Sequence, residues 1–288
     1  MPSPLRNLLD IERDLFIMAS FTRRIIVLGA LLMFPLLAAC GSQSNGGGNS
    51  ITLNVFAAAS LTQAFTQIGA NYTQAHPNVH FSFNFGGSNT LATDIIQGQP
   101  ADVFASANQT QMENVIKAGD IAPGSDKVFA HNRLVVITPK DNPGKINRLQ
   151  DLAKPGLKII LAAKEVPVGG YALTFLDKAS ADPSFGSDFK AKVLANVVSY
   201  EQDVKVVFSK VQLGEGDAGI VYTSDVSTNA SEVNEITIPD NLNVIADYPI
   251  APVKGSANAG TANDFIAYVL SSDGQAVLTK YGFISANG

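Results

Sequence analysis

From Ile51 onward, short apolar runs alternate with amphipathic stretches of helical period, and this alternation constrains the fold more than any other feature. The first unit is an apolar run at 51–56, followed by three alanines, Ser60 and helical spacing over 61–75. Strands that alternate with helices favour an α/β fold built on a mainly parallel sheet. The change from strand to helix at Ser60 predicts that this residue is the N-cap of the first helix.

The alternation continues to the end of the chain and falls into two similar halves. Two long apolar stretches, 128–138 and 247–253, are expected to carry the chain from one half to the other and back. We therefore predict a first lobe from 51–130 with 251–288, a second lobe from 131–250, and a ligand cleft between the two lobes. The other predicted strands are 79–85, 101–104, 158–162, 196–199, 218–222 and 236–238, and further helices are predicted at 109–118, 261–270 and 274–281.

The first residues of the chain carry signals of export rather than of fold. Arg23 and Arg24 precede an apolar run at 25–39, which is typical of a secretory signal peptide and is shorter than a usual membrane span. Cys40, the one cysteine of the chain, follows directly, and this arrangement resembles the bacterial lipoprotein signal. The resemblance implies cleavage before Cys40 and a lipid on its sulfur. An ordinary signal peptide that leaves a free cysteine is the alternative.

The segment after the predicted cleavage site, residues 40–50, is rich in Gly, Ser and Asn and is typical of a flexible tether. Met18 lies just before the basic pair, so we interpret residues 1–17 as a stretch that a later start codon would leave untranslated. We expect a signal peptide at 1–39 and an extracytoplasmic protein that is lipid-anchored to the cell membrane through Cys40.

Composition excludes several classes of protein. The chain has 288 residues, of which 46% are hydrophobic, so it is long enough for two lobes with proper cores. A formal net charge of −5 argues against a nucleic-acid-binding protein, which would carry a basic surface. One cysteine excludes an intramolecular disulfide and a cysteine-rich metal site.

Candidate binding residues lie where predicted strands end and helices begin. Such a helix start presents unpaired backbone N–H groups and the positive end of a dipole, and so it favours an anion. Each residue by itself also has a structural interpretation, since a serine there can simply cap its helix and a tyrosine can simply be half-buried. The recurrence of these features in both halves indicates a shared site. The candidates are Ser60, Ser88, Val168, Val204 and Tyr222.

Signals for catalysis are weak in this sequence. His76 and His80 are separated by a helix-breaking proline, and His131 lies alone in a predicted crossing strand. Ser60 lacks a Gly-x-Ser-x-Gly frame and a neighbouring histidine to act as base. We therefore expect a binding protein and no enzyme. An exported serine hydrolase using Ser60 is the alternative from a different class, and a two-lobed sensor domain ranks below both.

Several segments in order along the chain resemble the molybdate-binding proteins of bacterial molybdate ABC importers. The first is Val55-Phe56-Ala57-Ala58-Ala59-Ser60-Leu61. The others are 87–91, 98–107, 134–136, 166–172, 203–204, 219–222 and 281–283. The resemblance covers the chain from Ile51 to Phe283.

This resemblance implies a type II periplasmic-binding-protein fold that closes on molybdate or tungstate, with no cofactor and with molybdenum present only as its oxyanion. It implies as ligands the hydroxyls and N–H groups of Ser60 and Ser88, the N–H groups of Val168 and Val204, and the hydroxyl of Tyr222. It also implies delivery to an ABC importer permease with its ATPase, and we expect a monomer. Sulfate or another tetrahedral oxyanion is the alternative ligand.

The sequence departs from the family pattern at two places in the predicted site. Val168 stands where the family commonly has alanine, and Gly86-Gly87 stand where serine or alanine is usual. A backbone donor tolerates a change of side chain, although a β-branched residue narrows the conformations available to it. These departures bear on fine selectivity and not on the class of ligand.

Overall fold

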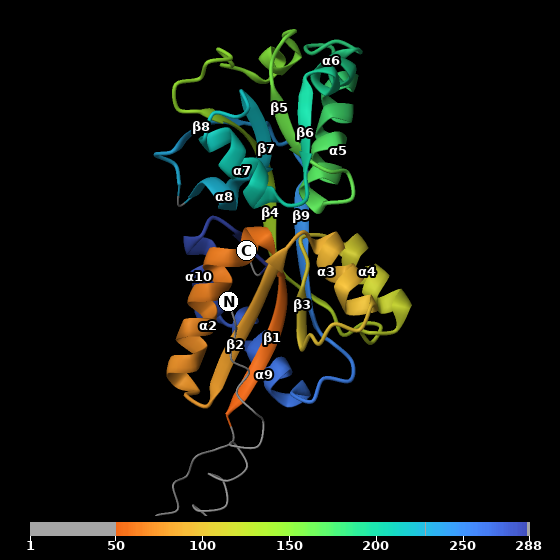
Figure 1. The fold of residues 1–288 in the computed structure, drawn as a ribbon, viewed down its shortest axis with the longest axis vertical. Coiled ribbons are helices and arrows are strands. Elements are labelled where there is room, and N and C mark those ends of the chain that lie inside the picture. Colours follow the sequence, from red (N-terminus) through yellow and green to blue (C-terminus); the bar gives the residue numbers. More distant parts are fainter. Residues whose placement is uncertain (1–49, 228, 287–288) are drawn as a thin grey trace, which may run out of the picture. The chain divides into compact units, whose positions relative to one another are not determined.

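The structure is a computed structural model that describes residues 50–227 and 229–286, and it confirms the predicted α/β fold with two lobes (Figure 1). The predicted signal peptide, Cys40 and the tether up to residue 49 lie outside the described residues. Within the described ranges, no helix has the length and apolar character needed to cross a membrane.

Three parallel strands form the centre of the first lobe, because β1 (Ile51–Ala58) pairs with β2 (Val79–Gly86) on one side and β3 (Val103–Ala105) on the other. Side chains of β1 enter two separate apolar clusters, one containing Leu53 and the other Phe56, so both faces of the strand are covered. The helices of this lobe are η1 (Ala59–Leu61), α2 (Thr62–Ala75), α3 (Ser88–Ile96), α4 (Gln109–Ala118), α9 (Ala259–Leu270) and α10 (Ser272–Lys280).

The second lobe repeats this plan. Strand β5 (Ile159–Ala162) pairs in parallel with both β6 (Val197–Glu201) and β7 (Ala218–Tyr222). All residues of β5 and β7 are buried. The helices of this lobe are η2 (Leu149–Ala153), α5 (Pro167–Ala181), α6 (Phe189–Ala195), α7 (Val204–Gln212) and α8 (Thr223–Ser227).

Two long strands connect the lobes, as the sequence predicts (Figure 1). The first half of β4 (Lys127–Pro139) pairs with β9 (Ile245–Pro252), and its second half pairs with β7 and with β8 (Val233–Thr237). All three pairings are antiparallel. For β4 and β9 this follows because one strand carries the chain out of the first lobe and the other carries it back. The predicted mainly parallel sheet is therefore correct within each lobe and wrong at the crossing strands.

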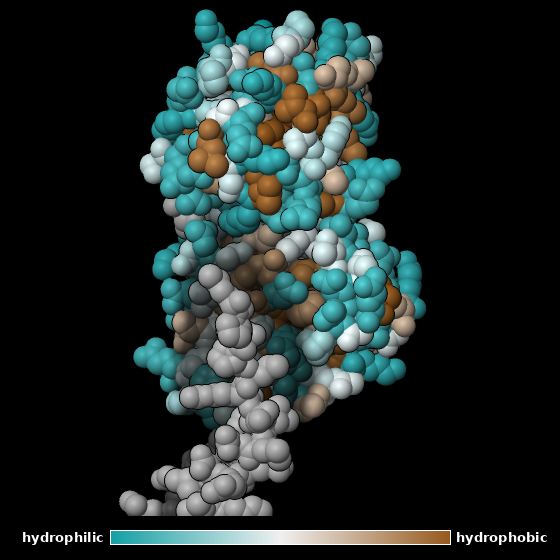
Figure 2. All heavy atoms as spheres, in the orientation of Figure 1, coloured by the Kyte–Doolittle hydropathy of each residue, from teal (hydrophilic) through white to brown (hydrophobic). Residues whose placement is uncertain are grey.

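The predicted limits of the lobes, after residues 130 and 250, fall inside these two crossing strands and stay a prediction. The short elements η2 and α6 and the two-residue strand β10 (Ile284–Ser285) are absent from the sequence prediction, because each is too short to show a clear period. Figure 2 shows a mostly hydrophilic surface on this face, with apolar residues gathered in patches on the upper lobe.

Candidate functional site

All five candidate residues line one small cavity to which both lobes contribute. The first lobe supplies the ends of β1 and β2 with the helix starts that follow them, and the second supplies the starts of α5 and α7 and the end of β7. The prediction that these junctions converge is therefore confirmed, whereas their role as ligands stays a prediction. The lining residues are Ala58, Ala59, Ser60, Gly86, Gly87, Ser88, Ala107, Val166, Pro167, Val168, Asp203, Val204 and Tyr222.

Ser60 is not the N-cap that the sequence predicts. The chain makes the 3₁₀ turn η1 after β1, so Ala58 takes the cap position of that turn and Leu61 takes the cap position of α2. Ser60 lies in the middle of the turn and is buried. Its Oγ lies 3.0 Å from the hydroxyl of Tyr248, which comes from the crossing strand β9. The side chain is thus held by a distant strand rather than by its own helix.

Ser88 is likewise the first residue of α3 and not its cap, because Gly87 occupies the N-cap position. The Oγ atom of Ser88 accepts a hydrogen bond from the backbone N–H of Ala107 at 3.0 Å, and the serine is almost fully buried. A hydroxyl that accepts from a backbone amide keeps its own proton for another acceptor. Ser88 can therefore donate into the cavity.

The second lobe contributes backbone N–H groups from two helix starts. Val168 follows Pro167 in the first turn of α5, and Val204 is the first residue of α7. Amides at these positions have no acceptor within their own helix. Asp203 caps α7 as the sequence indicates, since its Oδ1 accepts from the N–H of Val206 at 3.0 Å.

Gly169 lets α5 begin close to the preceding loop. A Cβ at this position would lie 2.1 Å from the carbonyl oxygen of Ala163. No larger residue fits against that carbonyl, so the glycine sets the position of the first turn of α5. This packing in turn fixes where the amide of Val168 lies beside the cavity.

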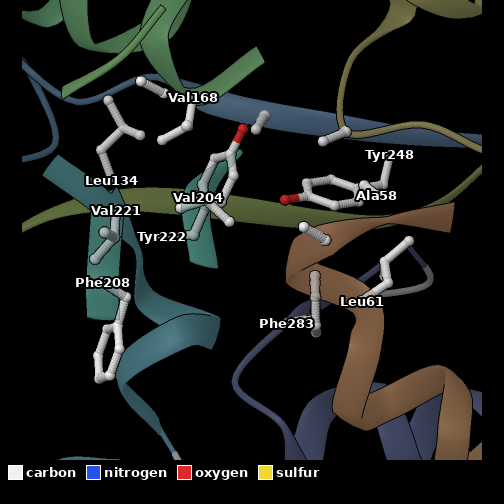
Figure 3. Close-up of a cluster of buried hydrophobic side chains, with 14 of the residues drawn as sticks. Ala58, Leu61, Leu134, Val168, Val204, Phe208, Val221, Tyr222, Tyr248 and Phe283 are labelled. Carbon is white, nitrogen blue, oxygen red and sulfur yellow. The ribbon is translucent and has the colours of Figure 1, made fainter. Parts of the chain in front are cut away.

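Tyr222 ends β7, and its hydroxyl is buried without a hydrogen-bond partner among the described residues. Burial raises the pKa of this phenol well above its ordinary value, so the hydroxyl keeps its proton. A buried polar group without a partner costs free energy unless a ligand satisfies it. Figure 3 shows Tyr222 with Val168 and Val204 drawn around it, and with the ring of Tyr248 as its neighbour.

None of the described residues that line this cavity is Lys, Arg or His, and the one charged residue of the lining, Asp203, accepts from the N–H of Val206 through Oδ1. Behind Tyr222, the buried carboxylate of Asp225 accepts from the N–H of Tyr222 at 3.1 Å and pairs with Lys205 at 3.1 Å. Burial raises the pKa of Asp225, and the neighbouring ammonium of Lys205 lowers it by less. The lysine near this junction therefore balances a buried carboxylate rather than facing the cavity.

The residues considered for catalysis lie in other environments. His131 pairs with Asp247 at 2.7 Å, and His76 stacks on Tyr72 with ring centroids 4.3 Å apart. The hydroxyl of Ser60 contacts the phenol of Tyr248, which cannot take up the serine proton because burial raises its pKa and keeps it protonated.

Two residues next to the site are missing from the sequence prediction. Tyr248 contacts Ser60, and Asn132, on the other crossing strand, contacts Tyr248 through Nδ2 at 3.4 Å. Nothing in the sequence distinguishes Tyr248 from other aromatic strand residues. Asn132 does carry a signal, because it is a buried amide just before the apolar run at 134–137. A buried amide in a strand must find partners for its side chain.

A fold of two α/β lobes joined by crossing strands, with a small polar cavity lined by both, defines a solute-binding protein. The chain belongs to the family of bacterial extracellular solute-binding proteins, whose sequence profile matches residues 53–284. It is 38% identical over 255 residues to the molybdate-binding protein ModA of Mycobacterium tuberculosis, with 86% of this chain and 92% of that protein covered. The predicted resemblance is therefore confirmed.

Solved structures agree with this assignment. A substrate-binding domain assigned to a molybdenum ABC transporter of Clostridium difficile superposes with a TM-score of 0.61 and 30% identity, covering 82% of this chain and all of that one. The periplasmic molybdate-binding protein of Azotobacter vinelandii shares the fold, with a TM-score of 0.70, 20% identity and coverage of 81% and 98%. A sulfate-binding protein of Synechococcus elongatus is more distant in sequence, at 25% identity over 295 residues.

Proposed function

We propose that this protein captures molybdate, and also tungstate, outside the cytoplasm and delivers it to the permease and ATPase of an ABC importer. The observation that carries the proposal is the convergence of Ser60, Ser88, Val168, Val204 and Tyr222 on one cavity without a cationic side chain. Relatives that cover most of the chain are molybdate-binding proteins. Such a site would hold the anion through neutral hydroxyl and amide donors alone.

The strength of such a site follows from the number of donors. Hydrogen bonds to a charged acceptor contribute about 1.5–3 kcal/mol each, so roughly seven of them suffice for sub-micromolar binding after the cost of association. Because each lobe holds part of the donor set, the bound anion would favour the arrangement in which both lobes contact it.

The protonation state of the ligand provides selectivity. Molybdate, tungstate and sulfate at neutral pH are dianions that offer acceptors only. Hydrogen phosphate carries an O–H that needs an acceptor, and a buried O–H without one costs free energy. We therefore expect strong rejection of phosphate, and sulfate is the demanding competitor because it differs mainly in size.

Isothermal titration of the purified chain with molybdate, tungstate, sulfate and phosphate tests this function. We expect tight binding of molybdate and tungstate, weaker binding of sulfate and far weaker binding of phosphate. Sulfate binding as tight as that of molybdate would contradict the proposed ligand. Ser60→Ala should weaken molybdate binding far more than it lowers the melting temperature.

The same variant tests the alternative of an exported serine hydrolase. Turnover in a broad panel of esters that disappears in Ser60→Ala would favour the hydrolase and contradict the binding protein. We expect no turnover, since Ser60 contacts Tyr248 and no imidazole in the described chain.

The part of the proposal that concerns the membrane depends on the sequence before Ser50. We propose that the chain is cleaved before Cys40, lipidated there and held at the cell membrane as a monomer, with residues 41–50 as the tether. Cys40→Ala should release the protein from the membrane fraction and abolish incorporation of a labelled fatty acid. Retention of the label in that variant would contradict the lipid anchor.

A further inference from the structure

A hydrogen-bonded network of buried side chains leads from the cavity to both crossing strands. Ser60 Oγ lies 3.0 Å from the hydroxyl of Tyr248, and that hydroxyl lies 3.4 Å from Nδ2 of Asn132. Asn132 and Tyr248 are fully buried, and Ser60 is nearly so. Figure 3 shows the ring of Tyr248 beside Tyr222, with its hydroxyl on the side of Tyr222. The order of donors and acceptors along this network decides where the proton of Ser60 points.

The amide of Asn132 has only one orientation that satisfies its neighbours. One end of the amide meets the backbone N–H of Arg133 at 2.9 Å, and a backbone N–H can only donate. That end must therefore be the oxygen, which also accepts from Oγ1 of Thr223 at 3.0 Å. The other end is consequently the NH₂ group, which donates to Ser224 Oγ at 2.8 Å and to Tyr248.

The direction of the remaining bond follows from this orientation. Because the phenolic oxygen of Tyr248 accepts from Asn132, its single proton is free to go to Ser60 Oγ. Ser60 then accepts from Tyr248, and its own proton is left to point toward the cavity that it lines. Each group thus donates to the next: the amide of Asn132 donates to the phenol of Tyr248, the phenol to the hydroxyl of Ser60, and that hydroxyl to the ligand.

We infer that Tyr248 and Asn132 are positioning residues that fix the hydroxyl of Ser60 as a donor to the oxyanion. The inference rests on the proposed function, since it requires that Ser60 contacts the anion. Burial raises the pKa of Tyr248 far above its ordinary range, so its proton stays available for Ser60 at any ordinary pH. Hydrogen bonds in such a chain also polarise one another and strengthen the last donor.

The hydrogen bond from Tyr248 to Ser60 affects which anions the site prefers. A serine hydroxyl that can rotate freely can either donate to an oxyanion or accept from a protonated one. The bond from Tyr248 occupies one of the two lone pairs of Ser60 and favours the orientation in which the serine proton points into the cavity, which matches a fully deprotonated anion better than hydrogen phosphate. Tyr248 would thus act on the ratio of molybdate to phosphate affinity, although it does not line the cavity itself.

Tyr248→Phe tests this inference because it removes one hydroxyl and keeps the ring in the aromatic packing with Tyr222 and Phe283. Molybdate affinity is measured by titration, and phosphate affinity by displacement of bound molybdate. We expect the molybdate affinity to fall several-fold and the molybdate-to-phosphate ratio to fall by about tenfold or more, the size of one lost hydrogen bond. Tyr72→Phe is the matched control, because Tyr72 is a buried tyrosine of the first lobe that does not line the cavity.

Asn132→Asp provides a second variant in case Tyr248→Phe does not fold. It keeps an oxygen for Arg133 and Thr223 and replaces the NH₂ group, which donates to Tyr248 and to Ser224, by a second oxygen. Tyr248 would then donate to the new carboxylate, and Ser60 would donate to Tyr248 instead of to the ligand, so the same ratio should fall. A ratio equal to that of the wild type in the folded variants would overturn the inference. If wild-type protein does not bind molybdate, the proposed function fails, which is a separate result.

Discussion

A Cβ atom added to Gly87 would lie 2.4 Å from the carbonyl oxygen of Gln202. Gly87 is the N-cap of α3 in the first lobe, and Gln202 follows β6 in the second. The backbone of Gly87 has a φ of −61°, which any residue can adopt, so its conformation does not require glycine. Glycine is required here because the backbone of the other lobe comes so close. The glycine that departs from the family pattern therefore lies where the two lobes touch beside the cavity.

Gly87→Ala should therefore impair ligand binding without weakening either lobe. The added methyl group would hold the lobes apart, because a carbon 2.4 Å from an oxygen lies far inside van der Waals contact. Donors from the two lobes could then no longer reach the same anion. We expect molybdate affinity to fall by about tenfold or more, the equivalent of at least one lost charged hydrogen bond, and the melting temperature of the ligand-free protein to stay near that of the wild type.

Gly86→Ala is the matched control for this change. A Cβ at Gly86 would lie 3.6 Å from Cδ2 of Leu91, which is an ordinary contact. Gly86 also lines the cavity, so the two variants place the same methyl group at adjacent positions of the same loop. Equal loss of affinity in both variants would show that the approach of Gln202 is not the cause.

Ser88→Ala should lower both stability and affinity. The hydroxyl of Ser88 is the acceptor for the buried N–H of Ala107, so its removal leaves that amide unpaired. The free energy of unfolding should fall by about 1–3 kcal/mol, measured by urea denaturation without ligand. Ser125→Ala is the control, because it removes a hydroxyl that donates to the carbonyl of Ala122 at the surface of the same lobe. It should change the free energy of unfolding by far less. Wild-type stability in Ser88→Ala would contradict the assigned hydrogen bond.

The fold and the convergence of the site could be predicted from the sequence, because both depend on local periodicity. Apolar runs locate the strands, and the carboxyl ends of parallel strands within a lobe meet at one edge of the sheet. Ser60 and Ser88 therefore lie side by side at the edge of the first lobe's sheet, and Val168 and Val204 do so in the second lobe.

The orientation of the two serines could not be predicted in this way. Whether a serine is the cap or the first residue of a helix depends on one backbone turn, which the 3₁₀ turn at Ala59–Leu61 decides for Ser60. Its partner Tyr248 lies 188 residues away on a crossing strand. Register between antiparallel strands so distant in sequence is fixed by tertiary packing and leaves no local signal.

Tyr222→Phe should stabilise the ligand-free protein while it weakens binding. The hydroxyl of Tyr222 is buried and has no partner in the described chain, so the ligand-free fold carries the cost of an unsatisfied polar group. Removing it should raise the free energy of unfolding by up to about 1–3 kcal/mol, and should cost about 1.5–3 kcal/mol of oxyanion binding, or roughly 10- to 150-fold in affinity. Urea denaturation and titration measure the two effects. A variant with wild-type affinity would remove Tyr222 from the ligand set.

Asp225→Asn should change how stability depends on pH. Burial raises the pKa of Asp225 in the folded state above its ordinary value of 3.8, and the ion pair with Lys205 offsets this only in part. The folded protein therefore holds this proton to higher pH than the unfolded chain does. The contribution of Asp225 to stability is fully present below about pH 3.8 and is lost as the pH rises through the raised pKa.

The difference between the wild type and Asp225→Asn isolates this group, when both unfolding free energies are measured by urea denaturation from about pH 4 to about pH 8. We expect the wild type to lose stability relative to the variant as the pH rises. The loss should approach about 1.4 kcal/mol for every pH unit that separates the folded-state pKa of Asp225 from the pKa in the unfolded chain. A difference that grows in favour of the wild type would show instead that the pair with Lys205 outweighs the burial of the carboxylate.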